Sequence, residues 1–232
     1  DGMHDECTQR LLYNVWKGKV QRWKGGRVLF LRYESFREYV RYYPVNTIIL
    51  ALLVIIHIGF AAAEWIYDVP GWLLKAVYGG FIKERNFNPE FWRYVSSVFL
   101  HANFGHLLFN AFAVFVFAPP LERTIGHFRY LVLFLFSGVI GNVFTFMFYS
   151  EVTSIGASGA VYGVFGAYVY FMIFHKGAID VISAKTLQTI LIVGLIYSFV
   201  PGVNFFAHIG GFIGGFVLNG MYVRMMMQGR GR

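Results

Sequence analysis

The sequence predicts an all-α membrane protein, a bundle of six transmembrane helices with a first loop at the membrane interface. Hydrophobic residues make up 57% of the chain, aromatic residues 20% and charged residues only 14%. A soluble domain of 232 residues could not bury that much apolar surface. Apolar segments also recur at lengths near the roughly 20 residues that cross about 30 Å of hydrocarbon. Finally, lysine and arginine fall unevenly between the connecting loops, as they do in membrane proteins.

Six apolar segments are long enough, or nearly so, to be membrane spans. The fifth is the shortest and leaves little room for tilt. In chain order, the expected spans are residues 45–65, 104–121, 128–149, 157–174, 187–199 and 203–222.

The basic residues predict the orientation of the bundle, because cytoplasmic loops collect lysine and arginine. A cytoplasmic N-terminus puts 16 of the 20 basic residues on the cytoplasmic side. Both termini are therefore expected to be cytoplasmic. The net charge of +8 is explained by juxtamembrane residues that attract anionic lipid, so the lipid bilayer is a partner and no nucleic acid is implied.

The chain is expected to divide into a basic leader, residues 1–43, and one membrane domain, residues 44–232. The leader holds nine of the basic residues, and Phe36, Val40 and Tyr43 lie at helical spacing near its end. It is expected to form an interfacial helix or a flexible anchor. The first loop, residues 66–99, is rich in aromatic side chains and is expected to lie at the membrane interface.

Two polar residues set among glycines are the candidate catalytic pair. Ser158 lies in the run Gly156-Ala157-Ser158-Gly159, and His208 is followed by Gly210 and Gly211. Each residue alone is more simply explained by a bond to a backbone carbonyl or by a polar contact between helices. The pair is different, because both begin spans at the outer face and both are followed by glycines at the four-residue spacing of close helix packing.

Further polar groups are expected at the same level of the membrane. With the N-terminus inside, His101 and His106 precede or open the second span, on the order of 10 Å below the outer surface. His106 and Asn110 share a helix face because they are four residues apart. Together with the Ser158 N–H, they could bind a developing oxyanion. Tyr162, one turn after Ser158, could support the His208 ring.

No aspartate or glutamate is placed to complete a triad, so a Ser-His dyad is expected, with packing and water orienting the histidine. These residues resemble the rhomboid family of intramembrane serine proteases. The resemblance covers about residues 44–222. It rests first on the motifs around the candidate site: the G-x-S-G form at Gly156 to Gly159, the His-x-x-x-Asn form at His106 and Asn110 with His101 upstream, and Ala207-His208 followed by spaced glycines including Gly211. It also rests on the pair Trp92-Arg93 in the first loop and on Glu122-Arg123 with Gly126 after the second span.

The resemblance implies that Ser158 is the nucleophile and His208 the base, with His106, Asn110 and the Ser158 N–H as the oxyanion site. It implies structural roles in the first loop for Trp92 and Arg93. The substrates would be single-span membrane proteins, each cut near the outer face after a small side chain. The substrate helix would enter beside the fifth span, under a mobile cap at residues 197–206. The six-span plan is similar to prokaryotic members in a cell membrane, and no cofactor or metal is implied.

Three other functions are compatible with parts of the sequence. A non-proteolytic rhomboid-like binder of membrane proteins would normally lack the serine or the histidine. A metalloprotease is disfavoured because no His-Glu-x-x-His occurs and His101 and His106 are not one helical turn apart. A transporter would need a polar path across the bilayer, whereas His57 and Asn142, which are mid-span, are expected to be satisfied core groups.

Overall fold

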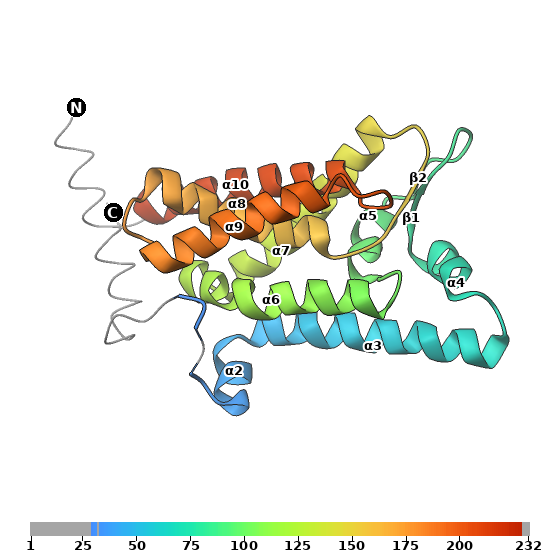
Figure 1. The fold of residues 1–232 in the computed structure, drawn as a ribbon, viewed down its shortest axis with the longest axis horizontal. Coiled ribbons are helices and arrows are strands. Elements are labelled where there is room, and N and C mark those ends of the chain that lie inside the picture. Colours follow the sequence, from blue (N-terminus) through green and yellow to red (C-terminus); the bar gives the residue numbers. More distant parts are fainter. Residues whose placement is uncertain (1–28, 32, 229–232) are drawn as a thin grey trace.

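The computed structural model describes residues 29–31 and 33–228, which form an all-α bundle with one small strand pair. Figure 1 shows the long helices lying side by side, with α2 at one end of the molecule and α4 and the strands at the other. The six main helices are α3 (Pro44–Tyr67), α6 (Phe104–Ile125), α7 (His127–Phe148), α8 (Ser158–Phe174), α9 (Val181–Tyr197) and α10 (Phe205–Gln228).

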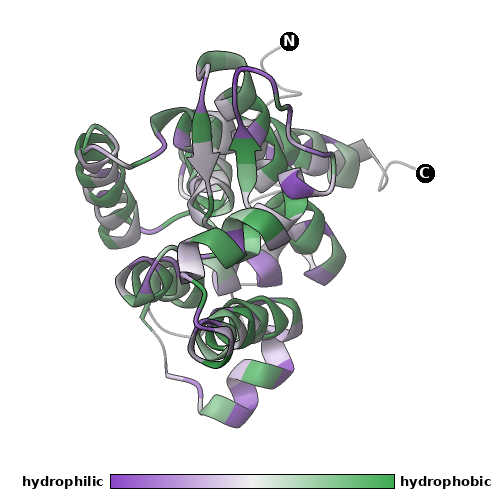
Figure 2. Cartoon of the chain, turned by 90° about the vertical axis from the view of Figure 1, so that its right-hand side faces the viewer, coloured by the Kyte–Doolittle hydropathy of each residue, from purple (hydrophilic) through white to green (hydrophobic). Residues whose placement is uncertain are grey.

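Helices α3, α6, α7 and α10 are long and apolar enough to cross a membrane, while α8 and α9 are shorter apolar helices. Figure 2 shows hydrophobic colour along most of the helices and much of the hydrophilic colour in the connecting segments. Each predicted span has a helix as its counterpart, and the all-α membrane fold class is confirmed.

Helix α9 begins six residues before its predicted span, at Val181, and ends at Tyr197. The side chain of Asp180 accepts a hydrogen bond from the Ser183 N–H at 2.9 Å and so caps the first turn. The helix therefore starts at a polar capping residue, where the apolar pattern alone suggested a later start.

The first loop contains ordered structure, namely α4 (Gly71–Tyr78), β1 (Phe81–Lys83), α5 (Arg93–Ser96) and the 3₁₀ helix η1 (Ser97–Phe99). Strand β1 pairs antiparallel with β2 (Val152–Ser154), so that Phe81 lies opposite Ser154. Lys83 Nζ also donates to the carbonyls of Phe146 and Tyr149 at 2.6 and 2.7 Å. This pairing, which was not predicted from the sequence, joins the first loop to the segment leading into α8.

Helix α2 (Phe36–Tyr42) is the described part of the predicted leader helix, and Ser35 and Glu38 cap its start. Of the three apolar residues at helical spacing, Phe36 is 82% exposed and Val40 37%, while Tyr43 is buried together with Tyr39. Tyr39 turns inward because its hydroxyl accepts from Asn46 Nδ2 at 2.6 Å. Most of the predicted leader, residues 1–28 and 32, lies outside the described residues.

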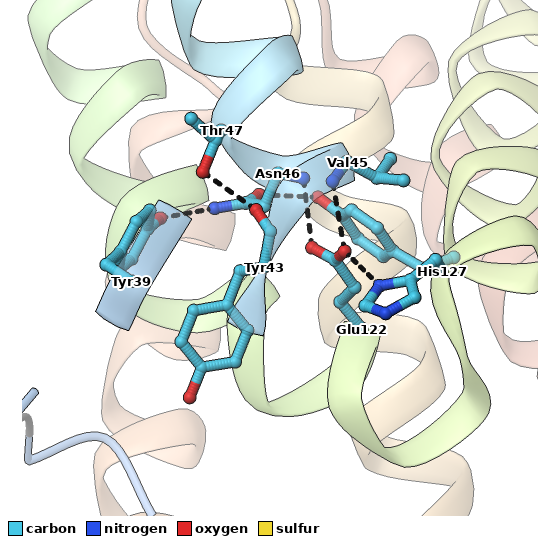
Figure 3. A network of polar contacts seen from close by, with 8 residues as sticks. Tyr39, Tyr43, Val45, Asn46, Thr47, Glu122 and His127 are labelled. Carbon is cyan, nitrogen blue, oxygen red and sulfur yellow. Dashed lines mark hydrogen bonds and ion pairs between the residues drawn. The ribbon is translucent and has the colours of Figure 1, made fainter. Parts of the chain in front are cut away.

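A buried carboxylate fastens the start of α3 to α6 and α7 (Figure 3). Glu122 on α6 accepts from the N–H groups of Val45 and Asn46 at 3.1 and 2.9 Å, which have no partner within the first turn of α3. His127 Nδ1 lies 2.6 Å from the same carboxylate. These partners compensate the cost of burying Glu122 completely.

Glycines bring α7, α8 and α10 into backbone contact. A Cβ on Gly211 of α10 would overlap the carbonyl of Gly159 on α8, and one on Gly215 would overlap Gly163. The neighbouring Gly210 faces α7 instead, where a Cβ would lie 2.7 Å from the carbonyl oxygen of Ile140. Gly211 and Gly215 thus face α8, while Gly210 faces α7, and the three backbones can pack closely.

We predict that Gly211→Ala lowers the thermal unfolding midpoint, because the added methyl group must push α8 and α10 apart. The cost is expected to be about 1–3 kcal/mol, as for other overpacked sites. Gly59→Ala on α3 is the matched control, since nothing lies within 4 Å of a Cβ there. Tryptophan fluorescence during heating in detergent would measure both. Equal midpoints for the two variants would contradict the role assigned to close helix approach.

Candidate active site

Ser158 is the first residue of α8 and is half-buried. The chain reaches it through Gly156, whose φ of 134° favours glycine and whose N–H donates to the Ser97 carbonyl at 2.9 Å. At the start of a helix, the Ser158 N–H has no acceptor one turn earlier and lies at the positive end of the helix dipole. This position suits a donor to an anion.

His106 and Asn110 lie on α6 against the loop that leads to Ser158. A Cβ on Gly156 would lie 2.7 Å from both Cε1 and Nε2 of His106 and 3.9 Å from Asn110 Nδ2. Asn110 Nδ2 donates to the His106 carbonyl at 3.1 Å, which uses one of the two amide hydrogens. Asn103 caps this turn by accepting from the His106 N–H at 2.9 Å. The structure therefore brings these two side chains next to the Ser158 loop.

His208 lies in the first turn of α10 and is 5% exposed. The ring of Tyr162, on α8, stacks on the imidazole with 4.1 Å between ring centroids and 7° between planes. In addition, His208 Nδ1 lies 2.6 Å from the hydroxyl oxygen of Ser198, the residue that follows α9. Aromatic stacking and one short hydrogen bond thus hold the ring.

Ser158 and His208 lie next to a contact between the backbones of α8 and α10. A Cβ on Gly159, next to Ser158, would lie 3.3 Å from the carbonyl oxygen of Ala207, next to His208. Among the described residues, however, no hydrogen bond joins the Ser158 hydroxyl to His208. Hydrogen bonds between catalytic groups are often long without substrate and tighten in the reacting complex.

His101 lies directly before α6, with its ring edge-on to His106 at 5.1 Å between centroids. It is 1% exposed, and neither ring nitrogen has a hydrogen-bond partner among the described residues. The adjacent Ala102 carbonyl accepts from Lys75 Nζ at 3.1 Å. Burial lowers the pKa of Lys75, and the Glu64 carboxylate opposes that shift.

The two expected core groups in mid-span have different surroundings. Asn142 Nδ2 donates to the Tyr94 carbonyl and to the Ser97 hydroxyl at 2.8 and 2.9 Å, so this group is satisfied as predicted. The expectation for His57 was wrong at one atom, because its buried Nδ1 has no partner in the described part of the chain. Within the same residues, no three histidine, cysteine, aspartate or glutamate side chains are placed to hold a metal ion.

Arg93 bonds to the end of α4, and the Trp92 ring lies against its guanidinium group. The Arg93 guanidinium donates to the carbonyls of Ala76, Val77 and Gly80 at 2.6 to 2.9 Å, and it also pairs with Glu90. The Trp92 ring lies 4.6 Å from the same group. The bonds to Ala76 and Val77 satisfy carbonyl groups in the last turn of α4 that have no partner within the helix.

Comparison with known proteins identifies the family of the chain. A model of the rhomboid domain matches residues 88–225. The chain is 36% identical over 203 residues to a Bacillus subtilis protein named "Putative rhomboid protease YdcA", an alignment that covers 84% of this chain and 97% of that protein. The chain belongs to the rhomboid family.

Other rhomboid relatives match over shorter parts of their own length. Rhomboid protease GluP of Bacillus subtilis is 34% identical over 128 residues, which cover 55% of this chain and 25% of that protein. RHOMBOID-like protein 4 of Arabidopsis thaliana is 35% identical over 155 residues, which cover 64% of this chain and 39% of that protein. The predicted family is confirmed, and with its apolar helices the chain is an integral membrane protein. These relatives support, in general terms, a protease that acts in the membrane.

Two residues next to the catalytic candidates were missed by the sequence reasoning. Asn204 caps α10 by accepting from the Ala207 N–H at 2.9 Å, and its amide donates to Thr145 and Ser154. An asparagine just before a helix is a recognisable capping signal. Ser198 had no comparable signal, because a single serine at the end of an apolar segment resembles any helix end.

We predict that Arg93→Ala lowers the thermal unfolding midpoint of this rhomboid protein, because the change leaves two carbonyl groups at the end of α4, and one just after it, without their donor. Arg93→Lys should recover only part of the loss, since an ammonium cannot reproduce the guanidinium fork. Arg85→Ala, at an exposed position of the same loop, is the control. Unfolding in detergent would be followed by tryptophan fluorescence. Full recovery by lysine would contradict the bonding described here.

Proposed function

We propose that this rhomboid protein is an intramembrane serine endopeptidase that cuts transmembrane helices through a dyad of Ser158 and His208. One observation carries the proposal: three helices bring their polar groups to one place. Gly156, two residues before Ser158, lies against the His106 ring of α6, and Tyr162 of α8 stacks on His208 of α10. A nucleophile, a base and anion donors are the groups that peptide hydrolysis needs.

In the proposed reaction, His208 Nε2 takes the proton of the Ser158 hydroxyl as the oxygen attacks the scissile carbonyl carbon. The carbonyl oxygen becomes an oxyanion in the tetrahedral intermediate. When the C–N bond breaks, Nε2–H gives the proton to the leaving amine, and an acyl-enzyme remains. Water then attacks the ester with His208 again as base, which releases the acid and restores Ser158.

The oxyanion would be bound by the Ser158 N–H, the free amide hydrogen of Asn110 and an N–H of the His106 ring. The support is their common position around Gly156 and the freedom of the Ser158 N–H at the start of α8. His101, with two unpartnered buried ring nitrogens, suits a bound water molecule near His106. In this proposal, His101 supports hydration of the site and does not touch the reacting atoms.

We further propose that substrates are single-span membrane proteins that approach beside α9 from the lipid. Ile192, Val193 and Ile196 on this helix are each 60–67% exposed. Within the predicted cap at residues 197–206, the part after Ser198 would be the part that moves, with Phe199 only 5.0 Å from Phe205 between ring centroids. The distribution of basic residues supports cytoplasmic termini and a site reached from the outer side.

A non-proteolytic binder of membrane proteins is the competing function. It would hold a helix in the same position and needs neither a nucleophile nor a base. The presence of both Ser158 and His208 beside anion donors favours the protease.

We predict that Ser158→Ala and His208→Ala each lower cleavage of a model transmembrane substrate by on the order of 10⁴- to 10⁶-fold, because residues that act as a unit fail together. Ser150→Ala, at an exposed serine before β2, should leave cleavage unchanged. A fluorophosphonate probe should label Ser158, and far less so without His208. Cleavage by the Ser158→Ala protein, or substrate binding without any cleavage by the wild type, would overturn the proposal.

We predict that Asn110→Ala lowers kcat by about 10²- to 10³-fold with little change in KM, as expected for loss of one oxyanion donor. The amide of Asn110 bonds within its own helix, to the His106 carbonyl. The change therefore leaves no group on another helix without its hydrogen-bond partner. The thermal unfolding midpoint should therefore stay close to that of the wild type. A large fall in both stability and kcat would assign Asn110 to helix packing instead.

A further inference from the structure

The end of α9 supplies a partner for His208 that the dyad mechanism does not use. Ser198 is 2% exposed, and its hydroxyl oxygen lies 2.6 Å from Nδ1 of the imidazole. The nitrogen that would face the Ser158 side is therefore Nε2. Most of the other polar contacts of the site are made by α6, α8 and α10, so this bond adds α9 to the site.

The hydrogen bonds around Ser198 determine which of the two groups donates. The hydroxyl carries a single hydrogen, which it gives to the Gly194 carbonyl at 2.7 Å. The 2.6 Å contact must then run from Nδ1–H to the hydroxyl oxygen. The second lone pair of that oxygen faces the Tyr162 hydroxyl at 3.3 Å. This count assigns the neutral His208 ring to the tautomer with hydrogen on Nδ1 and a free lone pair on Nε2.

We propose that Ser198 is a positioning residue that fixes the tautomer and the ring orientation of His208, so that Nε2 is the basic atom. The inference rests on the proposed dyad. When Nε2 takes the Ser158 proton, the ring becomes an imidazolium and the Nδ1–H bond to Ser198 becomes charge-assisted and stronger. No proton moves between Ser198 and His208. Ser198 thus takes the orienting place that a carboxylate holds in a catalytic triad.

Ser198 is not a second nucleophile, although it contacts the histidine directly. Its hydroxyl hydrogen is committed to a carbonyl, and its burial keeps a substrate carbonyl away. It also lies at the C-terminal end of α9, where backbone carbonyl groups and not N–H groups are unpaired. An oxyanion formed there would find no backbone donors.

The approach of α9 to the site depends on Gly194. A Cβ at this position would lie 2.5 Å from the Tyr162 hydroxyl oxygen. The absence of a side chain lets Tyr162 lie between His208 and α9, stacked on the one and within reach of Ser198 on the other. Stacking fixes the plane of the imidazole, and the Ser198 bond fixes its rotation within that plane.

Ser198→Ala, Ser198→Thr and the control Thr186→Ala test the inference in the full-length protein. Thr186 lies on the same helix and also bonds the carbonyl four residues earlier, at 3.0 Å, away from His208. We expect Ser198→Ala to lower kcat by about 10- to 100-fold with KM nearly unchanged, a part of the roughly 10²- to 10⁴-fold that a positioned base contributes. Ser198→Thr should restore most of kcat, and Thr186→Ala should behave as wild type.

Nitrogen NMR of histidine-labelled protein gives a readout that does not depend on activity. The His208 signals, identified by comparison with His208→Gln, should show hydrogen on Nδ1 in the wild type and in Ser198→Thr, and a mixture of tautomers in Ser198→Ala. Hydrogen on Nε2 in the wild type, or an unchanged tautomer and kcat in Ser198→Ala, would overturn the inference. Fluorophosphonate labelling of Ser198 would also overturn it.

These outcomes separate the inference from the proposed function. If Ser158→Ala still cut substrate, the dyad would be wrong whatever the tautomer of His208. If Ser158→Ala were inactive while Ser198→Ala kept its tautomer and its kcat, the dyad would stand and Ser198 would have no positioning role. A Ser198→Ala protein with a lower unfolding midpoint but normal kcat per folded molecule would mark a purely structural residue.

Discussion

The contact between the backbones of α8 and α10 is the constraint on which the rest of the structure depends. At Gly159 and Gly163 the carbonyl groups of α8 occupy the space that side chains on Gly211 and Gly215 would fill. In a bilayer, helices gain little from hiding apolar surface from each other, so packing at this distance supplies much of the association. The same contact brings the first turn of α8 beside the first turn of α10, where the two catalytic candidates lie. Stability and the proposed chemistry therefore share one set of glycines.

Helix α6 connects this contact to the rest of the bundle. Near one end, its buried Glu122 binds the first N–H groups of α3 and the ring of His127, which fixes the helix against α3 and α7. Near the other end, His106 and Asn110 lie against Gly156 in the loop before Ser158. A buried carboxylate is costly unless it is fully bonded, so α6 has little freedom to slide. The anion donors of the proposed site are thus held by a network at the opposite end of the same helix.

Much of this fold could be predicted from the sequence, because span length and apolar composition are local properties. The spacing of glycines predicted close packing, and the motifs around Ser158, His106 and His208 predicted the family. The sequence could not predict which glycines face which helix or the pairing of β1 with β2, because each depends on a partner distant in the chain. The contact of Ser198 with His208 was not predictable either, because it depends on how the segment between α9 and α10 folds.

A hydroxyl next to His208 also explains how a protease of this kind could work without a carboxylate as the third catalytic group. A carboxylate at the buried position of Ser198 would have to be ionised to act, and an ionised group costs several kcal/mol to bury unless it is well paired. A serine carries no charge to bury, and in this fold each of its hydrogen-bonding positions is used, by Gly194, Tyr162 and His208. It offers the histidine orientation but less electrostatic stabilisation of the imidazolium than a carboxylate would. The stacked Tyr162 ring compensates for part of that difference, because the face of an aromatic ring attracts a cation.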